Sequence, residues 1–301
     1  MEPPLLCGEE PGLLYTSNIP VGMVTFIAAD SVLNILFQRE TAMKLKSLFL
    51  ATVMAALLGC SADQPPIDAV TANDGLPDGA YLIAGVTVTD NGEVSQYSRD
   101  QIKIYTNGRF MYAFNNAQTQ GIDVGGGDAT WLNGVMVEVP RVNHNGPVSG
   151  YSFDVAIQQT DSGFEQTILG MEYPDGRLLD MVEVWDTAST STSVFDGLWQ
   201  MDVRESNDPD TSAFSETKMI GGGHFIWLQN AIYKGEVMKH FGYGTFAVDV
   251  DGNAVETAMI SSMEDYEGTV NSVSMKMIDE DHFTQSFTFN GELVTQSYSR
   301  M

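Results

Sequence analysis

The sequence is poor in cysteine and in basic residues. Its 301 residues include two cysteines, Cys7 and Cys60, and 14 Lys+Arg against 40 Asp+Glu, for a formal net charge of −26. Contacts to nucleic-acid phosphates need clustered lysine and arginine, so we predict no nucleic-acid partner. We interpret the acidity as a solubility device rather than as an acidic recognition face.

Recognisable catalytic and cofactor motifs are also lacking. There is no His-Glu-x-x-His, phosphate loop, Gly-x-Ser-x-Gly or dinucleotide fingerprint, and the four histidines show no metal-ligand spacing. The segment from Asp249 to Asn253 begins like a calcium loop, but its twelfth position is Ile260 instead of glutamate. We therefore expect a plain hairpin turn there, and we predict no catalytic residue, no metal and no cofactor.

A basic start followed by a short apolar run occupies residues 43–60, MKLKSLFLATVMAALLGC. This arrangement is typical of a secretory signal, and the run is too short for a comfortable membrane span, which needs about 20 apolar residues. The ending Leu57-Leu58-Gly59-Cys60 resembles a bacterial lipobox. The resemblance implies a signal peptide at 43–59, an acylated N-terminal Cys60 and lipid anchoring in the cell envelope. The alternatives are an ordinary secretory signal or an apolar core helix.

The resemblance also bears on the flanking segments. Ser61 follows the cysteine, which resembles the outer-membrane sorting pattern of enterobacterial lipoproteins. We expect residues 1–42 to be a leader from a misplaced start codon and residues 60–78 to be a polar tether. With the leader removed and Cys60 acylated, the mature chain would have no free thiol, disulfide or Cys-based metal site.

From residue 79 onward, short β-type runs alternate with turn residues. Asn-Gly and Asp-Gly pairs supply the positive φ angles of tight hairpins, and no long stretch has helical periodicity. We predict an all-β chain. The expected strands of the first half are 80–89, 101–105, 110–114, 129–132, 135–139, 152–158, 164–171 and 178–185.

The same pattern of residues then repeats at an offset of roughly 115 to 119 residues, which indicates an internal duplication. Asp78-Gly79-Ala80-Tyr81 matches Asp196-Gly197-Leu198-Trp199, and the ten residues 103–112 match 218–227 without a gap. Later matches include Glu138 with Glu256 and the segment 164–167 with 283–286. The first copy spans 79–186, a Ser/Thr-rich linker 187–195, and the second copy 196–301.

Each copy has enough strands, about eight, to close into an up-and-down antiparallel barrel. The Gly-x-Trp at Gly197, the Gly-x-Phe-x-Trp at Gly223 and the glycine-rich segments 125–127 and 242–244 resemble the lipocalin-like group of small bacterial barrels. The first copy departs from this pattern with Tyr81 in place of tryptophan. The resemblance implies two tandem lipocalin-like barrels, each enclosing a small apolar or amphipathic ligand.

The candidate ligand-binding residues lie on the best-matched strands. Lys103 and Lys218 occupy equivalent positions between apolar neighbours. Each would bind a carboxylate ligand inside its barrel or face solvent, and we favour solvent. Four aromatic residues that follow the lysines in the two matched segments would be core or cavity lining. They are Phe110, Tyr112, Phe225 and Trp227. On its strand His224 alternates with Phe225, so we expect it to point outward as an exterior or rim residue.

Three functions fit these features. The first is a lipid-anchored protein that binds a small hydrophobic or amphipathic molecule. The second is an envelope interaction module with filled barrels. The third is a lipocalin-like isomerase, cyclase or hydratase. A barrel is compatible with all three. Because no catalytic motif is present, we rank binding first, interaction second and enzyme third.

Overall fold

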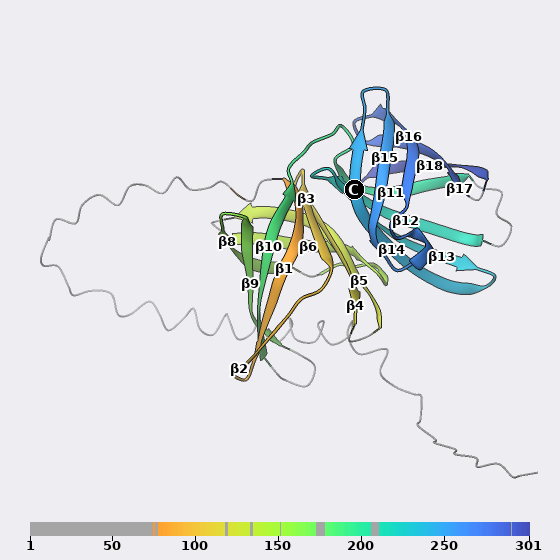
Figure 1. Ribbon diagram of the computed structural model, residues 1–301. Helices are drawn as coiled ribbons and strands as arrows, with labels where there is room; N and C mark the ends of the chain where they lie inside the picture. The colour runs from red at the N-terminus through yellow and green to blue at the C-terminus, as the bar shows by residue number, and fades with distance from the viewer. Residues whose placement is uncertain are drawn as a thin grey trace, which may run out of the picture. The chain divides into compact units, whose positions relative to one another are not determined.

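The computed structural model describes residues 75, 78–117, 120–132, 135–150, 152–172, 178–205, 211–289 and 291–301, with the backbone alone at 171 and 172. The predicted leader (1–42), signal peptide (43–59) and nearly all of the tether (60–78) lie outside these residues, as does Cys60. The described chain forms two closed antiparallel β-barrels, which confirms the predicted all-β fold (Figure 1).

Barrel 1 has eight strands in its closed wall. They are β1 (Gly79–Asp90), β3 (Gln101–Thr106), β4 (Arg109–Asn116), β5 (Gly121–Leu132), β6 (Val135–Asn143), β8 (Phe153–Gln159), β9 (Gly163–Glu172) and β10 (Leu178–Ser189). Pairing of β10 with β1 closes the wall. Two short strands lie outside it: β2 (Glu93–Tyr97) pairs only with β1, and β7 (Gly146–Pro147) pairs only with β6. Strand β10 continues to Ser189, within the segment that we predicted as the linker.

Barrel 2 also has eight strands. They are β11 (Gly197–Glu205), β12 (Thr211–Gly221), β13 (His224–Tyr233), β14 (Glu236–Val248), β15 (Asn253–Ser261), β16 (Val270–Asp279), β17 (His282–Phe289) and β18 (Glu292–Arg300). Pairing of β18 with β11 closes the wall. A single 3₁₀ turn, η1 (Glu264–Tyr266), lies between β15 and β16, and no α-helix occurs among the described residues.

The tight turns follow the predicted turn chemistry. Asn107 and Gly108, between β3 and β4, have φ angles of 50° and 71°, as a type I′ hairpin turn requires. The segment at Asp249 is a hairpin turn as expected, because the Asp249 carboxylate accepts hydrogen bonds from the backbone N–H groups of Asp251 and Asn253. Every cross-strand pair in both walls is antiparallel, so each connection joins strand ends at one rim of its barrel.

The two rims of a barrel differ. We call the rim where the chain enters and leaves the barrel its proximal end; it holds Gly79 and Ser189 in barrel 1, and Gly197 and Arg300 in barrel 2. The opposite rim is the distal end. The longer described connections reach this distal end, including η1 in barrel 2.

Strand alternation places apolar side chains in two separate environments. One alternate set fills each barrel interior, and the other set lies on the outer wall. Part of the outer set forms a cluster shared by both barrels, with Ile102, Ile104 and Met111 from barrel 1 and Met219, Ile226 and Phe241 from barrel 2, all fully buried. The two barrels are therefore packed against each other.

Polar bonds accompany this shared cluster. The Asn107 side-chain amide donates to the Asp196 carbonyl at 3.1 Å, and Arg109 donates to the Met301 carbonyl at 2.9 Å. Both bonds join residues of different copies, so folding of one copy is coupled to packing of the other. No helix among the described residues has the length and apolarity that crossing a bilayer requires.

Candidate functional site

The two equivalent lysines lie inside the barrels. Lys103 is 3% exposed and Lys218 is 2% exposed. Each is cross-strand neighbour to two aromatic residues: Tyr81 and Tyr112 flank Lys103, and two tryptophans, Trp199 and Trp227, flank Lys218. The solvent-facing placement that we favoured for these lysines is therefore wrong.

The reason lies in the apolar neighbours. Ile102 and Ile104 flank Lys103 on β3, and both belong to the cluster shared between the barrels. Strand alternation then directs the lysine side chain to the opposite face, which is the barrel interior. Apolar residues beside a lysine indicated an amphipathic strand correctly, but the apolar face turned out to be the outer one.

The deep layer of barrel 1 is a polar cluster centred on Lys103. Its Nζ lies 2.6 Å from Glu138 Oε1 and donates to Gln166 Oε1 at 2.9 Å. The Tyr105 hydroxyl also donates to Glu138. Because a carboxylate of the same barrel compensates its charge, Lys103 does not need a counter-ion from a ligand.

Barrel 2 repeats this arrangement with the matching residues. Lys218 Nζ lies 2.5 Å from Glu256 Oε1 and donates to Gln285 Oε1 at 3.0 Å. Gln285 Nε2 in turn donates to Gln296 Oε1 at 2.6 Å and to the Tyr298 hydroxyl at 3.1 Å. A Lys–Glu–Gln cluster at the same depth is thus a property of both copies.

Aromatic side chains fill the proximal part of each interior. In barrel 1 the Tyr81 ring meets Phe164 edge-on at 4.9 Å, and Phe164 stacks on Trp185 at 6.1 Å. In barrel 2 Trp199, Phe283 and Tyr298 repeat the edge-on and stacked contacts at 4.8 Å and 4.6 Å. These packed rings occupy the proximal end, so a ligand would have to be held toward the distal end.

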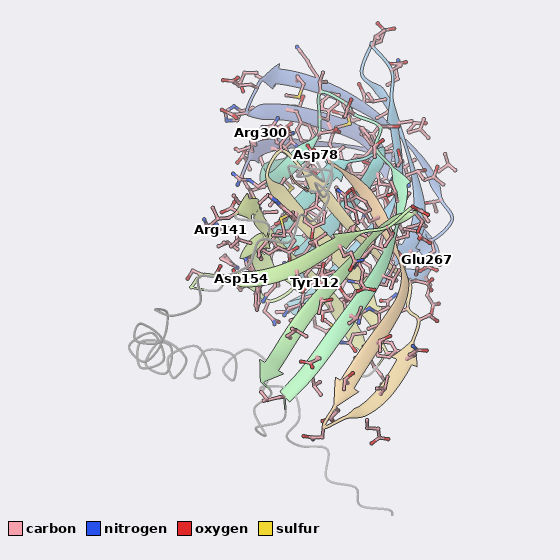
Figure 2. The ribbon with its side chains drawn as sticks, turned by 90° about the vertical axis from the view of Figure 1, so that its left-hand side faces the viewer. Asp78, Tyr112, Arg141, Asp154, Glu267 and Arg300 are labelled. Carbon is pink, nitrogen blue, oxygen red and sulfur yellow. The ribbon has the colours of Figure 1, made fainter. Side chains whose placement is uncertain are left out.

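The predicted aromatic residues divide between these layers. Phe110 and Phe225 are buried with the packed rings of barrels 1 and 2, respectively. Tyr112 lies farther toward the distal end, among the strands of barrel 1, where its hydroxyl donates to Asp123 Oδ1 at 3.2 Å (Figure 2). Trp227 contacts Tyr266 of η1 edge-on at 5.3 Å. Whether any of the six predicted residues touches a ligand stays a prediction.

His224 occupies the outer face, as alternation with Phe225 predicted. It is nevertheless only 6% exposed, and its Nδ1 lies 2.8 Å from the Gly222 carbonyl. Burial lowers the pKa of His224. The expectation of a solvent-facing exterior residue is corrected in this respect, because the outer wall here is covered.

Near the distal end of barrel 1, an arginine lies across a phenylalanine ring. The Arg99 guanidinium is centred 4.1 Å from the Phe114 ring, donates to Gln101 Oε1 at 2.5 Å and pairs with Glu183 at 2.6 Å. Its side chain is 19% exposed. The charge of Lys103 opposes the rise in the pKa of Glu183, so this pair lies within electrostatic reach of the Lys103 cluster.

Barrel 2 also has an arginine lying on a phenylalanine ring, but the two residues stand at other positions of the repeat. The Arg204 guanidinium of β11 is centred 4.1 Å from the ring of Phe214 on β12. Below the arginine, each barrel has one carboxylate and one amide, but at swapped positions. The position two residues before the lysine is Gln101 in barrel 1 and Glu216 in barrel 2. The position two residues before the aromatic residue of the last strand is Glu183 in barrel 1 and Gln296 in barrel 2.

Several carboxyl and phenol groups inside the barrels ionise abnormally. Burial raises the pKa of Glu183, although the charges of Lys103 and Arg99 oppose the rise. Burial likewise raises the pKa of Asp123. Burial and the neighbouring Glu216 carboxylate raise the pKa of Tyr298 well above its usual value. The interior therefore disfavours additional negative charge, and a neighbouring arginine or lysine reduces this penalty.

Sequence reasoning missed Arg99, Arg204, Glu138 and Glu183. Glu138 carried a signal, since it matches Glu256 in the duplication. The arginines carried none, because they stand at different positions in the two copies. Within the described residues, no group of three or more His, Cys, Asp or Glu side chains is placed to hold a metal ion.

Comparisons with known proteins add little. No family model matches the chain, and no curated protein matches its sequence. A solved structure of a protein of unknown function, from the DUF3598 family of Nostoc punctiforme, is similar at 10% identity, covering 74% of this chain and 96% of that one, with a TM-score of 0.23. A likeness at that score supports no argument about fold or function.

Proposed function

We propose that this chain is a lipid-anchored cell-envelope protein that binds a small amphipathic molecule in the distal part of one or both barrels. The observation that carries the proposal is the layering of each interior. Packed aromatic rings fill the proximal end, a Lys–Glu–Gln cluster follows, and an arginine lying on a phenylalanine ring stands near the distal end.

This layering supports an amphipathic ligand for a physical reason. The rings and methionines of the wall favour an apolar chain, since burial of apolar surface is worth about 25 cal/mol per Å². The guanidinium and amide groups supply directional hydrogen bonds for a polar head. A purely apolar ligand would leave Arg204 Nε, a buried guanidinium nitrogen with no hydrogen-bond partner among the described residues, unsatisfied at a cost of about 1–3 kcal/mol.

The test uses the full chain and a panel of twelve-carbon probes, namely dodecanol, dodecanoate and dodecyltrimethylammonium. Calorimetric titration below micelle-forming concentrations should reveal saturable binding of at least one probe, with one or two sites per chain. Absence of saturable binding for all three would reject the binding function and favour filled barrels with a role in interaction.

Anchoring is tested separately. Intact mass of the membrane-extracted protein should correspond to a chain that begins at an acylated Cys60, and Cys60→Ser should release the protein from the membrane fraction. An unmodified chain that retains residues 1–59 would reject the lipoprotein proposal, whatever the probes do.

One observation favours the enzyme as second candidate. Asp123 is a carboxyl group whose pKa is raised by burial, and a raised carboxyl pKa is typical of catalytic proton donors. If barrel 1 is an isomerase or hydratase, the organic molecule recovered after incubation will differ from the one supplied. Recovery of the unchanged molecule at full yield would support binding alone.

A further inference from the structure

Arg204 stands near the end of β11, at the distal end of barrel 2. Its cross-strand partner on β18 is Gln296, and its guanidinium lies flat over Phe214. The Arg204 Nε atom is buried, yet it has no hydrogen-bond partner among the described residues. The positive charge of Arg204 also opposes the rise in the pKa of Tyr298, so this charge is felt inside the barrel.

The corresponding arginine of barrel 1 has a carboxylate partner, which Arg204 lacks. Arg99 also lies over a phenylalanine ring, but it pairs with Glu183 at 2.6 Å. The residue of barrel 2 that matches Glu183 is Gln296, which carries no charge. The carboxyl group below, Glu216, is already engaged.

Each carboxylate oxygen of Glu216 already accepts a hydrogen bond within the barrel. Oε1 accepts from the Tyr298 hydroxyl at 2.7 Å, and Oε2 accepts from Gln229 Nε2 at 2.8 Å. An ion pair of Arg204 with a carboxylate does not occur in the part of the chain that the structure describes. This is notable in a chain with 40 acidic and only 14 basic residues.

An unpaired buried donor is costly, and more so when it carries a charge, so such donors are normally satisfied by protein, water or ligand. The surroundings indicate the kind of ligand. Apolar side chains packed against the barrel core include Phe214, Met263, Tyr266 and Phe287. A planar guanidinium matches a carboxylate with two parallel N–H···O bonds, and a single guanidinium neutralises a single negative charge.

We propose that barrel 2 binds an amphiphile with one carboxylate head group, held by Arg204, with its apolar part against Phe214 and the Tyr266 side of the wall. This inference rests on the proposed binding function and adds to it the barrel, the head-group chemistry and the residue that recognises the head group. Barrel 1 is the less suitable barrel for an anion, because Glu183 already neutralises Arg99.

The experiment compares dodecanoate with dodecanol on the full chain at pH 8, by calorimetric titration. Arg204→Gln removes the charge and keeps a polar side chain, and Arg204→Lys keeps the charge without the planar fork. Arg141→Gln is the matched control, since Arg141 is an exposed arginine of barrel 1 with 54% of its side chain accessible. Thermal unfolding of each variant verifies that it is folded.

We expect dodecanoate to bind the unmodified chain at least tenfold more tightly than dodecanol does. Arg204→Gln should weaken dodecanoate binding at least tenfold and leave dodecanol binding within about twofold, with Arg204→Lys in between, as loss of a charge-assisted bond predicts. Arg141→Gln should change neither affinity.

Two outcomes overturn the inference in distinguishable ways. Equal affinities for the two probes, or a dodecanoate affinity that Arg204→Gln does not change, would refute carboxylate recognition by Arg204 while the binding function stands. If neither probe binds, both this inference and an amphiphile-binding role for barrel 2 fail together. Should Arg204→Gln fail to fold, the dodecanoate-to-dodecanol ratio of Arg204→Lys against the unmodified chain decides.

Discussion

Replacing Lys218 with methionine should destabilise the protein severely. Methionine nearly preserves the volume of the aliphatic stem, so the change isolates the loss of the ammonium group. Glu256, which is 5% exposed and lies 2.5 Å from Lys218 Nζ, would then be a buried carboxylate without a counter-ion. Breaking a buried ion pair by removal of one partner costs about 3–5 kcal/mol, and Gln285 would lose its donor too.

The second replacement should recover most of that loss. In Lys218→Met/Glu256→Gln no uncompensated charge remains, and neutral replacement of a whole buried pair is often near neutral in stability.

The assay is unfolding in urea and by heat, followed by circular dichroism, with Lys276→Met as control because Lys276 is an exposed lysine of β16. With about 2–4 °C per kcal/mol for a chain of this size, the single variant should melt roughly 6–20 °C lower. A loss below about 1 kcal/mol, or a double variant no more stable than the single one, would refute the view that the pair is a charge-compensated unit.

Three further changes test other parts of the molecule. Burial raises the pKa of Glu183 above its unfolded value, so the contribution of Glu183 to the free energy of unfolding should fall as pH rises from about 4.3. In urea titrations, the free energy of unfolding of Glu183→Gln relative to that of the unmodified chain should therefore increase between about pH 4.5 and 7.5. Parallel curves of this free energy against pH for the two proteins would contradict the prediction. Gly244→Ala would place a Cβ 1.9 Å from the Thr257 carbonyl oxygen at a β-bulge, and should lower stability by about 1–3 kcal/mol, whereas Gly85→Ala, with open space around it, should be almost silent. Ile226→Asp buries a carboxylate in the cluster shared by the barrels, which costs several kcal/mol, and it should split calorimetric unfolding into two transitions. Two transitions in the unmodified chain would contradict the coupling of the barrels.

Much of the architecture was predictable because it depends on local chemistry. Asn107-Gly108 demands positive φ at two successive residues, and only a tight hairpin uses such a pair, so the β3–β4 turn followed from two residues. By contrast, β2 was missed because all five of its residues are exposed. A strand without a buried face leaves no alternation for sequence reasoning to detect.

The candidate site was harder to predict because its key groups act across long sequence distances. Lys103 meets a glutamine 63 residues away, and Arg99 pairs with a glutamate 84 residues away. Nothing in the neighbourhood of an isolated lysine or arginine reveals that its partner lies on a distant strand. Duplication was the one available clue, and it identified Lys218 and Glu256 as recurrent without showing that they meet.

The inverted position of the lysines follows from the duplication itself. A lone barrel needs only an apolar interior, and its outer wall faces water, so lysine between two isoleucines predicts an outward lysine. Two joined barrels need apolar residues on the outer face of the strands that touch, here Ile104 and Met219. The interior face of those strands is then free to carry Lys103 and Lys218, provided that each is neutralised within its own barrel. The buried ion pairs and the covered outer wall are consequently two parts of one arrangement, and a single copy expressed alone should expose Ile102, Ile104 and Met111 and self-associate.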